Sequence, residues 1–151
     1  MTGKILRYLL ISVMALVAVS GLFGGLSLIV DPSGSSLQLP LLLLESTIFN
    51  SYLVPGLILL IFLGILPMFV AFGLITRRKV RFAKRINIYK KRHWAWTFSL
   101  YCGIILILWI DIQVMLIGGG YILQTIYALL GVLIIILTLS PQIIRFYKTK
   151  K

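Results

Sequence analysis

The sequence has few acidic residues and few charges of any kind. Three Asp and Glu stand against fifteen Lys and Arg, and charged residues make up 12% of the chain, whereas a soluble domain has about 25%. Hydrophobic residues make up 60% of the 151 residues. Water is therefore not the main solvent of this chain. Four membrane spans with their connections use nearly all of its length and leave no room for a soluble domain.

Residues that carry chemistry are also scarce. Cys102 is the only cysteine, which excludes an intramolecular disulfide and cysteine-cluster metal or redox chemistry. His93 is the only histidine, so a haem or zinc role has no partner ligands. No serine–histidine–acid arrangement, phosphate-binding glycine loop or HExxH motif occurs. We therefore expect no catalytic residues, no metal site and no cofactor.

Apolar runs dominate what is present. Each of four runs is long enough to cross a hydrocarbon core about 30 Å thick. They cover residues 5–30, 53–75, 94–117 and 121–144. The sequence thus predicts an all-α integral membrane protein, folded as a four-transmembrane-helix bundle in a single domain. The first run extends ten residues past Ser20, beyond the apolar region of a signal peptide, so we interpret it as a retained span.

Two features of these runs bear on helix packing. Gly21 and Gly25 form a small-xxx-small pair, which permits close approach of another helix. The pattern leaves open whether that helix belongs to the same chain or to a second copy; for four spans we expect the same chain. Pro67 lies inside the second run and predicts a kink and a hinge. The carbonyl freed near Leu63 then bonds to a neighbour or is satisfied by a local adjustment.

The basic residues define an orientation. They form three groups separated by two nearly uncharged connections, which places all fifteen on one side of the membrane. The positive-inside rule therefore predicts both termini in the cytoplasm, in a multi-pass protein of the cytoplasmic (inner) membrane. Because these cations sit at the ends of apolar runs, we expect no nucleic-acid partner.

The connection over residues 77–93 is strongly basic. Phe82, Ile86, Tyr89 and His93 follow the spacing of one helical face, which predicts a short amphipathic helix on the inner leaflet. We expect anionic headgroups to bind there at about 1 kcal/mol per cation. The alternative is that the cations only set topology. The residues predicted to contact anionic lipid are Arg77, Arg78, Lys79, Arg81, Lys84 and Arg85.

The outer connection over residues 31–52 begins with a turn at Asp31-Pro32-Ser33-Gly34, in which aspartate bonds the following backbone and proline fixes φ. The stretch from 37 to 49 is too short to span the bilayer. It predicts a short interfacial or re-entrant helix that begins near Pro40 and forms a lid over the outer end of the bundle.

Polar residues near the outer side form a candidate site. Asp111 lies about 25 Å along the third span, near the outer edge of the hydrocarbon core. We expect a partner to hold it, with Gln124 or the Asp31 turn nearest. The alternative is that each group is solvated or caps a helix. The candidate residues are Asp31, Glu45, Asp111, Gln113 and Gln124.

Several short motifs occur in the first half of the chain: Asp31-Pro32-Ser33-Gly34, Leu39-Pro40 and Tyr52-Leu53-Val54-Pro55-Gly56, with a looser one at His93-Trp94-Ala95-Trp96. In these motifs the chain resembles small uncharacterised four-span membrane proteins of bacteria. The resemblance implies one fold that runs through the whole chain. It implies no activity and no functional residues.

Three functions fit these observations. The first is a non-catalytic accessory, assembly or lipid-interacting component, whose partners are membrane lipids and, as further candidates, a second copy or another membrane protein. The alternative is a small transporter or channel with an outward-facing polar site and a hinge at Pro67. The third is a membrane enzyme that acts on a lipid.

Overall fold

The regular structure of the chain is helical. The computed structural model describes residues 2–45, 47–119 and 121–149, and no strand forms within them. Four helices are long and apolar enough to cross a membrane: Gly3–Val30, Leu53–Thr76, Trp94–Ile117 and Ile122–Leu139. The prediction of an all-α chain with four candidate membrane spans is therefore confirmed.

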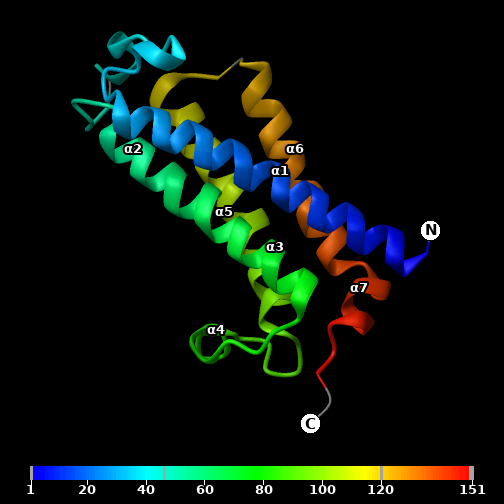
Figure 1. Ribbon diagram of the computed structural model, residues 1–151. Coiled ribbons are helices and arrows are strands. Elements are labelled where there is room, and N and C mark those ends of the chain that lie inside the picture. Colours follow the sequence, from blue (N-terminus) through cyan, green and yellow to red (C-terminus); the bar gives the residue numbers. More distant parts are fainter. Residues whose placement is uncertain (1, 46, 120, 150–151) are drawn as a thin grey trace.

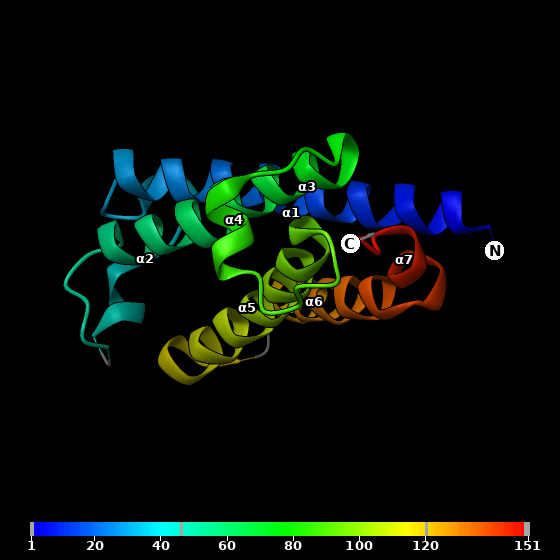
Figure 2. The same ribbon diagram turned by 90° about the horizontal axis from the view of Figure 1, so that it is seen from below.

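The four spans form two pairs. The first pair joins α1 (Gly3–Val30) to a continuous rod of α2 (Leu53–Ile58), a π-helical segment η3 (Leu59–Ile65) and α3 (Leu66–Thr76). The second pair joins α5 (Trp94–Ile117) to α6 (Ile122–Leu139). Figures 1 and 2 show the pairs close together at one end and diverging at the other.

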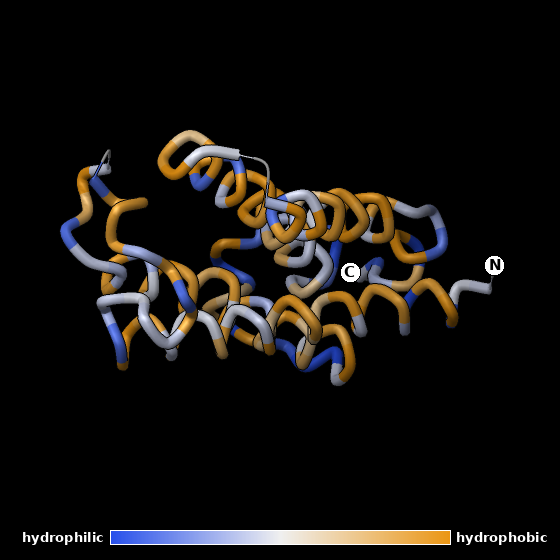
Figure 3. Tube along the Cα trace, turned by 90° about the horizontal axis from the view of Figure 1, so that it is seen from above, coloured by the Kyte–Doolittle hydropathy of each residue, from blue (hydrophilic) through white to orange (hydrophobic). Residues whose placement is uncertain are grey.

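The two ends of the bundle differ in charge. The N-terminus, α4 (Arg81–Ile86) and α7 (Pro141–Phe146) lie together at one end, which we call the basic end. The connection over residues 31–52 lies at the opposite end, which we call the loop end (Figure 1). Hydrophobic residues follow the long helices between the ends, as Figure 3 shows. Lys150 and Lys151 lie outside the described residues.

Glycines allow α1 to pack closely on the second span. A Cβ atom built on Gly25 would lie 2.6 Å from the Leu60 nitrogen, and one on Gly21 would overlap the Leu63 carbonyl. On the other side of the seam, a Cβ on Gly64 would lie 2.9 Å from the Leu22 nitrogen. Gly21 and Gly25 therefore contact a helix of their own chain, and this face is not free to receive a second copy.

Pro67 lies two residues after the end of the π-helical segment. It is the second residue of α3 within the continuous rod, so its missing N–H removes one bond from the helical ladder. The wider π-helical turns of η3, which ends at Ile65, are the local adjustment on its N-terminal side. The hinge role of Pro67 stays a prediction.

The basic end is densely packed. Leu10, Met14 and Leu74 are fully buried there, and the indole groups of Trp94 and Trp96 are almost fully buried. The C-terminal segment is held against this core by the Tyr147 hydroxyl, which donates to the Leu74 carbonyl at 2.7 Å.

Arg7 reinforces the same contact. Its guanidinium donates to the carbonyls of Leu74 at 3.2 Å and Ile75 at 3.1 Å, and it lies over the ring of Phe146. Arg7 is therefore occupied by its own chain, and it links the start of α1 to the ends of α3 and α7.

Two predicted helix boundaries are wrong. The fourth span ends at Leu139 rather than 144, because Ser140 adopts the extended backbone that a residue before proline prefers, and α7 starts at Pro141. The basic helix ends at Ile86, before Tyr89 and His93. Asn87 breaks it by turning its backbone out of the helical region and bonding the Tyr89 N–H.

The predicted outer helix is shorter than expected and is not an α-helix. A helical turn does begin after Pro40, but it is the 3-10 segment η2 (Leu41–Leu44), and a similar turn η1 (Ser35–Leu37) precedes it. Tyr52 fixes the connection by donating its hydroxyl proton to the Pro40 carbonyl at 3.0 Å. The segment is a folded loop rather than a re-entrant helix.

Candidate functional site: a cavity between the helix pairs

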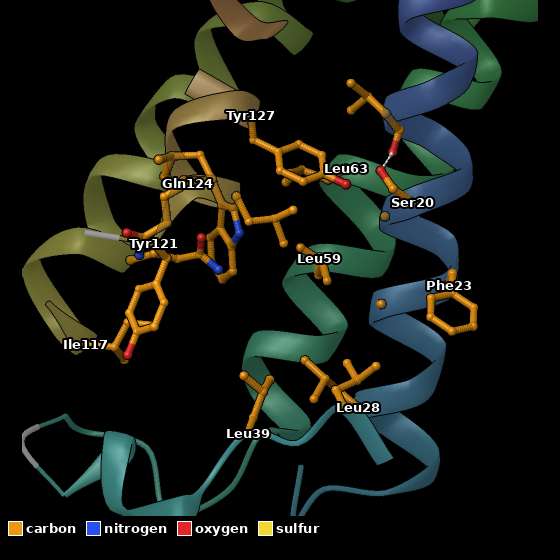
Figure 4. Close-up of a pocket in the computed structure, with 18 of the residues that line it drawn as sticks. Ser20, Phe23, Leu28, Leu39, Leu59, Leu63, Ile117, Tyr121, Gln124 and Tyr127 are labelled. Atoms are coloured by element: carbon orange, nitrogen blue, oxygen red, sulfur yellow. Dashed lines mark hydrogen bonds between the residues drawn. The ribbon is translucent and has the colours of Figure 1, made fainter. Parts of the chain in front are cut away.

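A cavity of about 470 Å³ lies between the two helix pairs toward the loop end. Small-molecule sites in proteins typically enclose about 300–1,000 Å³. The walls come from α1, η3, α5 and α6, and the connection over residues 31–52 contributes Leu37, Leu39 and Leu43. Figure 4 shows side chains of α6 facing those of η3 and α1 across the gap.

The cavity exists because the two helix pairs diverge and the residues that α1 presents between them are small. α1 presents Ser20, Gly21 and Gly24 to the gap, and these residues are too short to reach α6. Tyr127 extends from α6 toward Leu63, as Figure 4 shows. The cavity therefore lies in the half of the bundle nearer the loop end, away from the densely packed basic end.

The lining is apolar except for a few uncharged polar groups. Among the described residues that line the cavity, none is an acid, a lysine, an arginine or a histidine. The polar groups belong to Ser20, Trp109, Gln113, Gln124 and the two tyrosines at 121 and 127. Such a surface suits a hydrocarbon chain together with a neutral polar group.

Two of these polar groups lack hydrogen-bond partners. Three buried side-chain polar atoms of the described residues are unpaired, and two of them, Trp109 Nε1 and Gln124 Oε1, belong to residues of the cavity wall. The third is the hydroxyl of Tyr101. An unpaired buried donor or acceptor costs about 1–3 kcal/mol, so the cavity contains one unmet donor and one unmet acceptor.

The other two tryptophans differ from Trp109 in that their indole N–H groups have acceptors. Trp94 Nε1 donates to the Arg78 carbonyl at 2.7 Å, and Trp96 Nε1 donates to the Thr138 carbonyl at 2.8 Å. Trp109 has a comparable donor without a protein acceptor.

The orientation of the Gln124 amide follows from its single bond. Its Nε2 donates to the Gly118 carbonyl at 3.3 Å, which only an N–H group can do, so the unpaired atom is the oxygen. Gln124 is 8% exposed, and Figure 4 shows it on the α6 side of the gap. The unpaired acceptor therefore belongs to a nearly buried side chain in the low-dielectric wall of the cavity.

The polar groups are spread along the cavity. Trp109 lies fifteen residues after Trp94 and so about 22 Å along α5. Ser20 lies one turn from Val17 on α1, and Tyr127 extends toward Leu63, as Figure 4 shows. Leucines of the connection over residues 31–52 line the loop-end part.

A smaller cavity of about 120 Å³ adjoins the first. It shares Trp109 and Gln113 with the larger cavity and extends beneath the connection over residues 31–52, where Thr47 and Tyr52 line it. Trp109 therefore borders both cavities.

The predicted outer polar residues do not form one site. Gln113 and Gln124 both line the larger cavity, whereas Asp31, Glu45 and Asp111 do not. The Asp31 carboxylate instead organises its own turn. Hydrogen bonds from the Ser33 hydroxyl and the Ser36 N–H lower the pKa of Asp31.

The expected partner for Asp111 is absent. Its side chain is exposed on α5 and makes no hydrogen bond or ion pair with any residue that the structure describes. The prediction that Gln124 or the Asp31 turn holds this carboxylate is therefore wrong: Gln124 bonds to the Gly118 carbonyl and Asp31 to its own turn. Glu45 is also exposed, at the end of η2.

Trp109 and the two tyrosines were missing from the predicted site. Trp109 is four residues before Gln113, and Tyr121 and Tyr127 are three residues on either side of Gln124, so each set shares a helical face. This spacing was available in the sequence. A tryptophan near the end of a span also fits an interfacial aromatic belt, so the residue type alone does not indicate a cavity.

A second surface lies at the basic end. Of the six residues predicted to contact anionic lipid, Arg77 is partly used internally, because it lies over the Phe146 ring and donates to the Phe146 carbonyl at 3.4 Å. The other five side chains are exposed and form no ion pair within the described residues. We call them the exposed basic cluster: Arg78, Lys79, Arg81, Lys84 and Arg85.

Apolar side chains accompany the exposed basic cluster. Phe82 is 67% exposed and Ile86 is 48% exposed on α4, although both are large and hydrophobic. Ala83 faces the opposite way and is fully buried against the bundle. The short helix is thus anchored by one face and presents apolar and basic groups on the other.

Comparisons of the chain with protein-family models, with curated proteins and with solved structures found no match.

Proposed function

We propose that the protein is a non-catalytic, lipid-interacting component of the cytoplasmic membrane, and that it holds the hydrocarbon chain of a lipid in the cavity between its helix pairs. The observation that carries this proposal is the cavity of about 470 Å³, with its apolar walls and its unpaired Trp109 and Gln124 groups. With both termini in the cytoplasm, the loop end faces the outer leaflet, and the lipid enters from that leaflet.

The lining favours a lipid over an ion or a water-soluble solute. Transport sites for charged substrates usually include ionisable groups near the membrane midplane, but the described residues of this lining are uncharged. The half of the bundle nearer the basic end is filled by buried side chains such as Met14, Leu74 and Trp96. A lipid chain needs only the blind, apolar space that the opposite half provides.

An enzymatic role has less support. Cleavage of a lipid needs a nucleophile with a base, or a metal that activates water. No group of three or more metal-binding side chains occurs among the described residues, and Asp111 and Glu45 lie away from the cavity wall. The uncharged polar groups of the wall are suited to binding.

At the cytoplasmic side, we propose that the exposed basic cluster contacts anionic headgroups. Five cations without anionic partners surround the exposed Phe82 and Ile86, which can enter the interface between headgroups and acyl chains. One lipid contact in each leaflet would fix both the position and the orientation of this small protein in the bilayer.

Filling the cavity tests its role. Leu59 lines the gap, so Leu59→Trp should occupy the space, whereas Leu57→Trp adds the same side chain to a lipid-facing position that is 40% exposed. Native mass spectrometry of protein purified in a mild detergent measures the lipid that each variant retains. We expect Leu59→Trp to lose the co-purified lipid and Leu57→Trp to keep it. Equal retention by the two variants would contradict the proposal.

A further inference from the structure

The cavity also indicates what kind of polar group its ligand has. We propose that the ligand is a neutral lipid whose hydroxyl or amide groups donate a hydrogen bond to Gln124 Oε1 and accept one from Trp109 Nε1. This inference rests on the proposed function, because it assumes that the cavity holds a lipid.

The first step is the matched pair of unmet groups. Trp109 Nε1 can only donate, and Gln124 Oε1 can only accept. A partner that satisfies both must offer an acceptor and a donor. A hydroxyl or a secondary amide offers both, whereas a simple ester or ether offers only acceptors.

The second step is the absence of charge. No described residue of the lining carries a charge, so a phosphate near Trp109 and Gln124 would have no countercharge. The Gln124 oxygen would also repel an anion, because it is itself an acceptor. The pair therefore selects an uncharged group.

The third step is the shape of the ligand. Trp109 and Gln124 belong to α5 and α6, and the wall opposite them, at Leu59 and Leu63 of η3, is apolar. A molecule with a short polar part and a hydrocarbon chain fits this arrangement, with its polar part near Trp109 and its chain along η3. A monoacylglycerol has this chemistry.

Competition between two lipids in the same detergent tests the inference. Monoolein and methyl oleate carry the same acyl chain and ester, but only monoolein has hydroxyl groups. Native mass spectrometry should show about tenfold preference for monoolein over methyl oleate in the unaltered protein. Dioleoyl phosphatidylglycerol, which has hydroxyls and a phosphate, should compete poorly for the cavity.

Substitutions assign the preference to the two residues. Trp109→Phe and Gln124→Met each remove one polar partner and keep an apolar surface, so each should reduce the preference to about onefold to threefold. Methyl oleate should still bind. Gln142→Met is the matched control, because Gln142 is exposed on α7 and lies far from the cavity, and it should leave the preference unchanged.

The outcomes separate this inference from the proposed function. Loss of all lipid in Leu59→Trp, with equal binding of monoolein and methyl oleate in the unaltered protein, would overturn the inference and leave the lipid site intact. A preference that survives in both polar variants would overturn it as well, as would selective binding of phosphatidylglycerol that requires Gln124. If a variant fails to fold, the comparison of ligands on the unaltered protein still decides the question.

Discussion

Replacement of Gly21 by alanine should weaken the contact between α1 and the second span. The added Cβ would overlap the Leu63 carbonyl and lie 2.7 Å from the Gly64 nitrogen, whereas carbon atoms normally pack at about 3.5–4.0 Å. Backbone atoms cannot rotate away as a side chain can. The two helices must therefore separate, and overpacking of this kind costs about 1–3 kcal/mol.

Gly24→Ala provides the control on the same helix. Its Cβ would meet only the end of the Leu59 side chain, 2.9 Å away, and that side chain borders the cavity and can move into it. Both substitutions gain about 1 kcal/mol of helix propensity, so this term cancels when the two variants are compared. The remaining difference in unfolding free energy should be about 1–3 kcal/mol, with Gly21→Ala the less stable.

Reversible unfolding in mixed micelles, followed by circular dichroism, measures this difference. Equal stability of the two alanine variants would refute the reasoning, because it would mean that the seam at Gly21 opens without loss. A Gly21→Ala protein that dimerises would also be inconsistent with a glycine face that is used within the chain.

Three further predictions follow from the basic end. Replacing the exposed basic cluster with glutamine should weaken binding to vesicles that contain phosphatidylglycerol and reduce its salt dependence; unchanged binding would leave those cations with a topological role only. His93 Nδ1 accepts from the Ala95 N–H, and burial lowers the pKa of His93. The stability that neutral His93 contributes is therefore present above about pH 6.5 and should be lost as the pH falls toward the lowered pKa. His93→Asn should flatten this pH dependence of the thermal midpoint. Tyr147→Phe should cost about 0.5–1.5 kcal/mol through loss of the bond to Leu74, and Tyr8→Phe, at a side chain 64% exposed, should cost nothing measurable.

The number and position of the spans could be predicted from the sequence, because apolar length alone sets them. The errors fall where local chemistry ends a helix. Ser140 before Pro141 stops the fourth span, and buried Asn87 stops the basic helix although the apolar spacing continues to His93. Periodicity reports which face is apolar, but it does not report the hydrogen bonds that compete with the helix.

The candidate site could be predicted only in part. Gln113 and Gln124 attract notice as polar residues in apolar runs, and both line the cavity. Asp111 attracts more notice because it is charged, yet its side chain is exposed. The cavity itself arises from the angle between the two helix pairs, which no single motif of the sequence encodes.

The most direct test of a lipid in the cavity uses the indole N–H groups themselves. The protein has three tryptophans, and two of their indole groups already donate to backbone carbonyls. In a ¹⁵N-labelled sample in micelles, the Trp109 indole signal is assigned by its loss in Trp109→Phe, and monoolein is then added stepwise. The account predicts a saturable downfield shift of the Trp109 signal alone, as its proton gains an acceptor, with Trp94 and Trp96 unchanged. A titration in which Trp109 does not shift, or in which all three signals move together, would contradict a lipid site between the helix pairs.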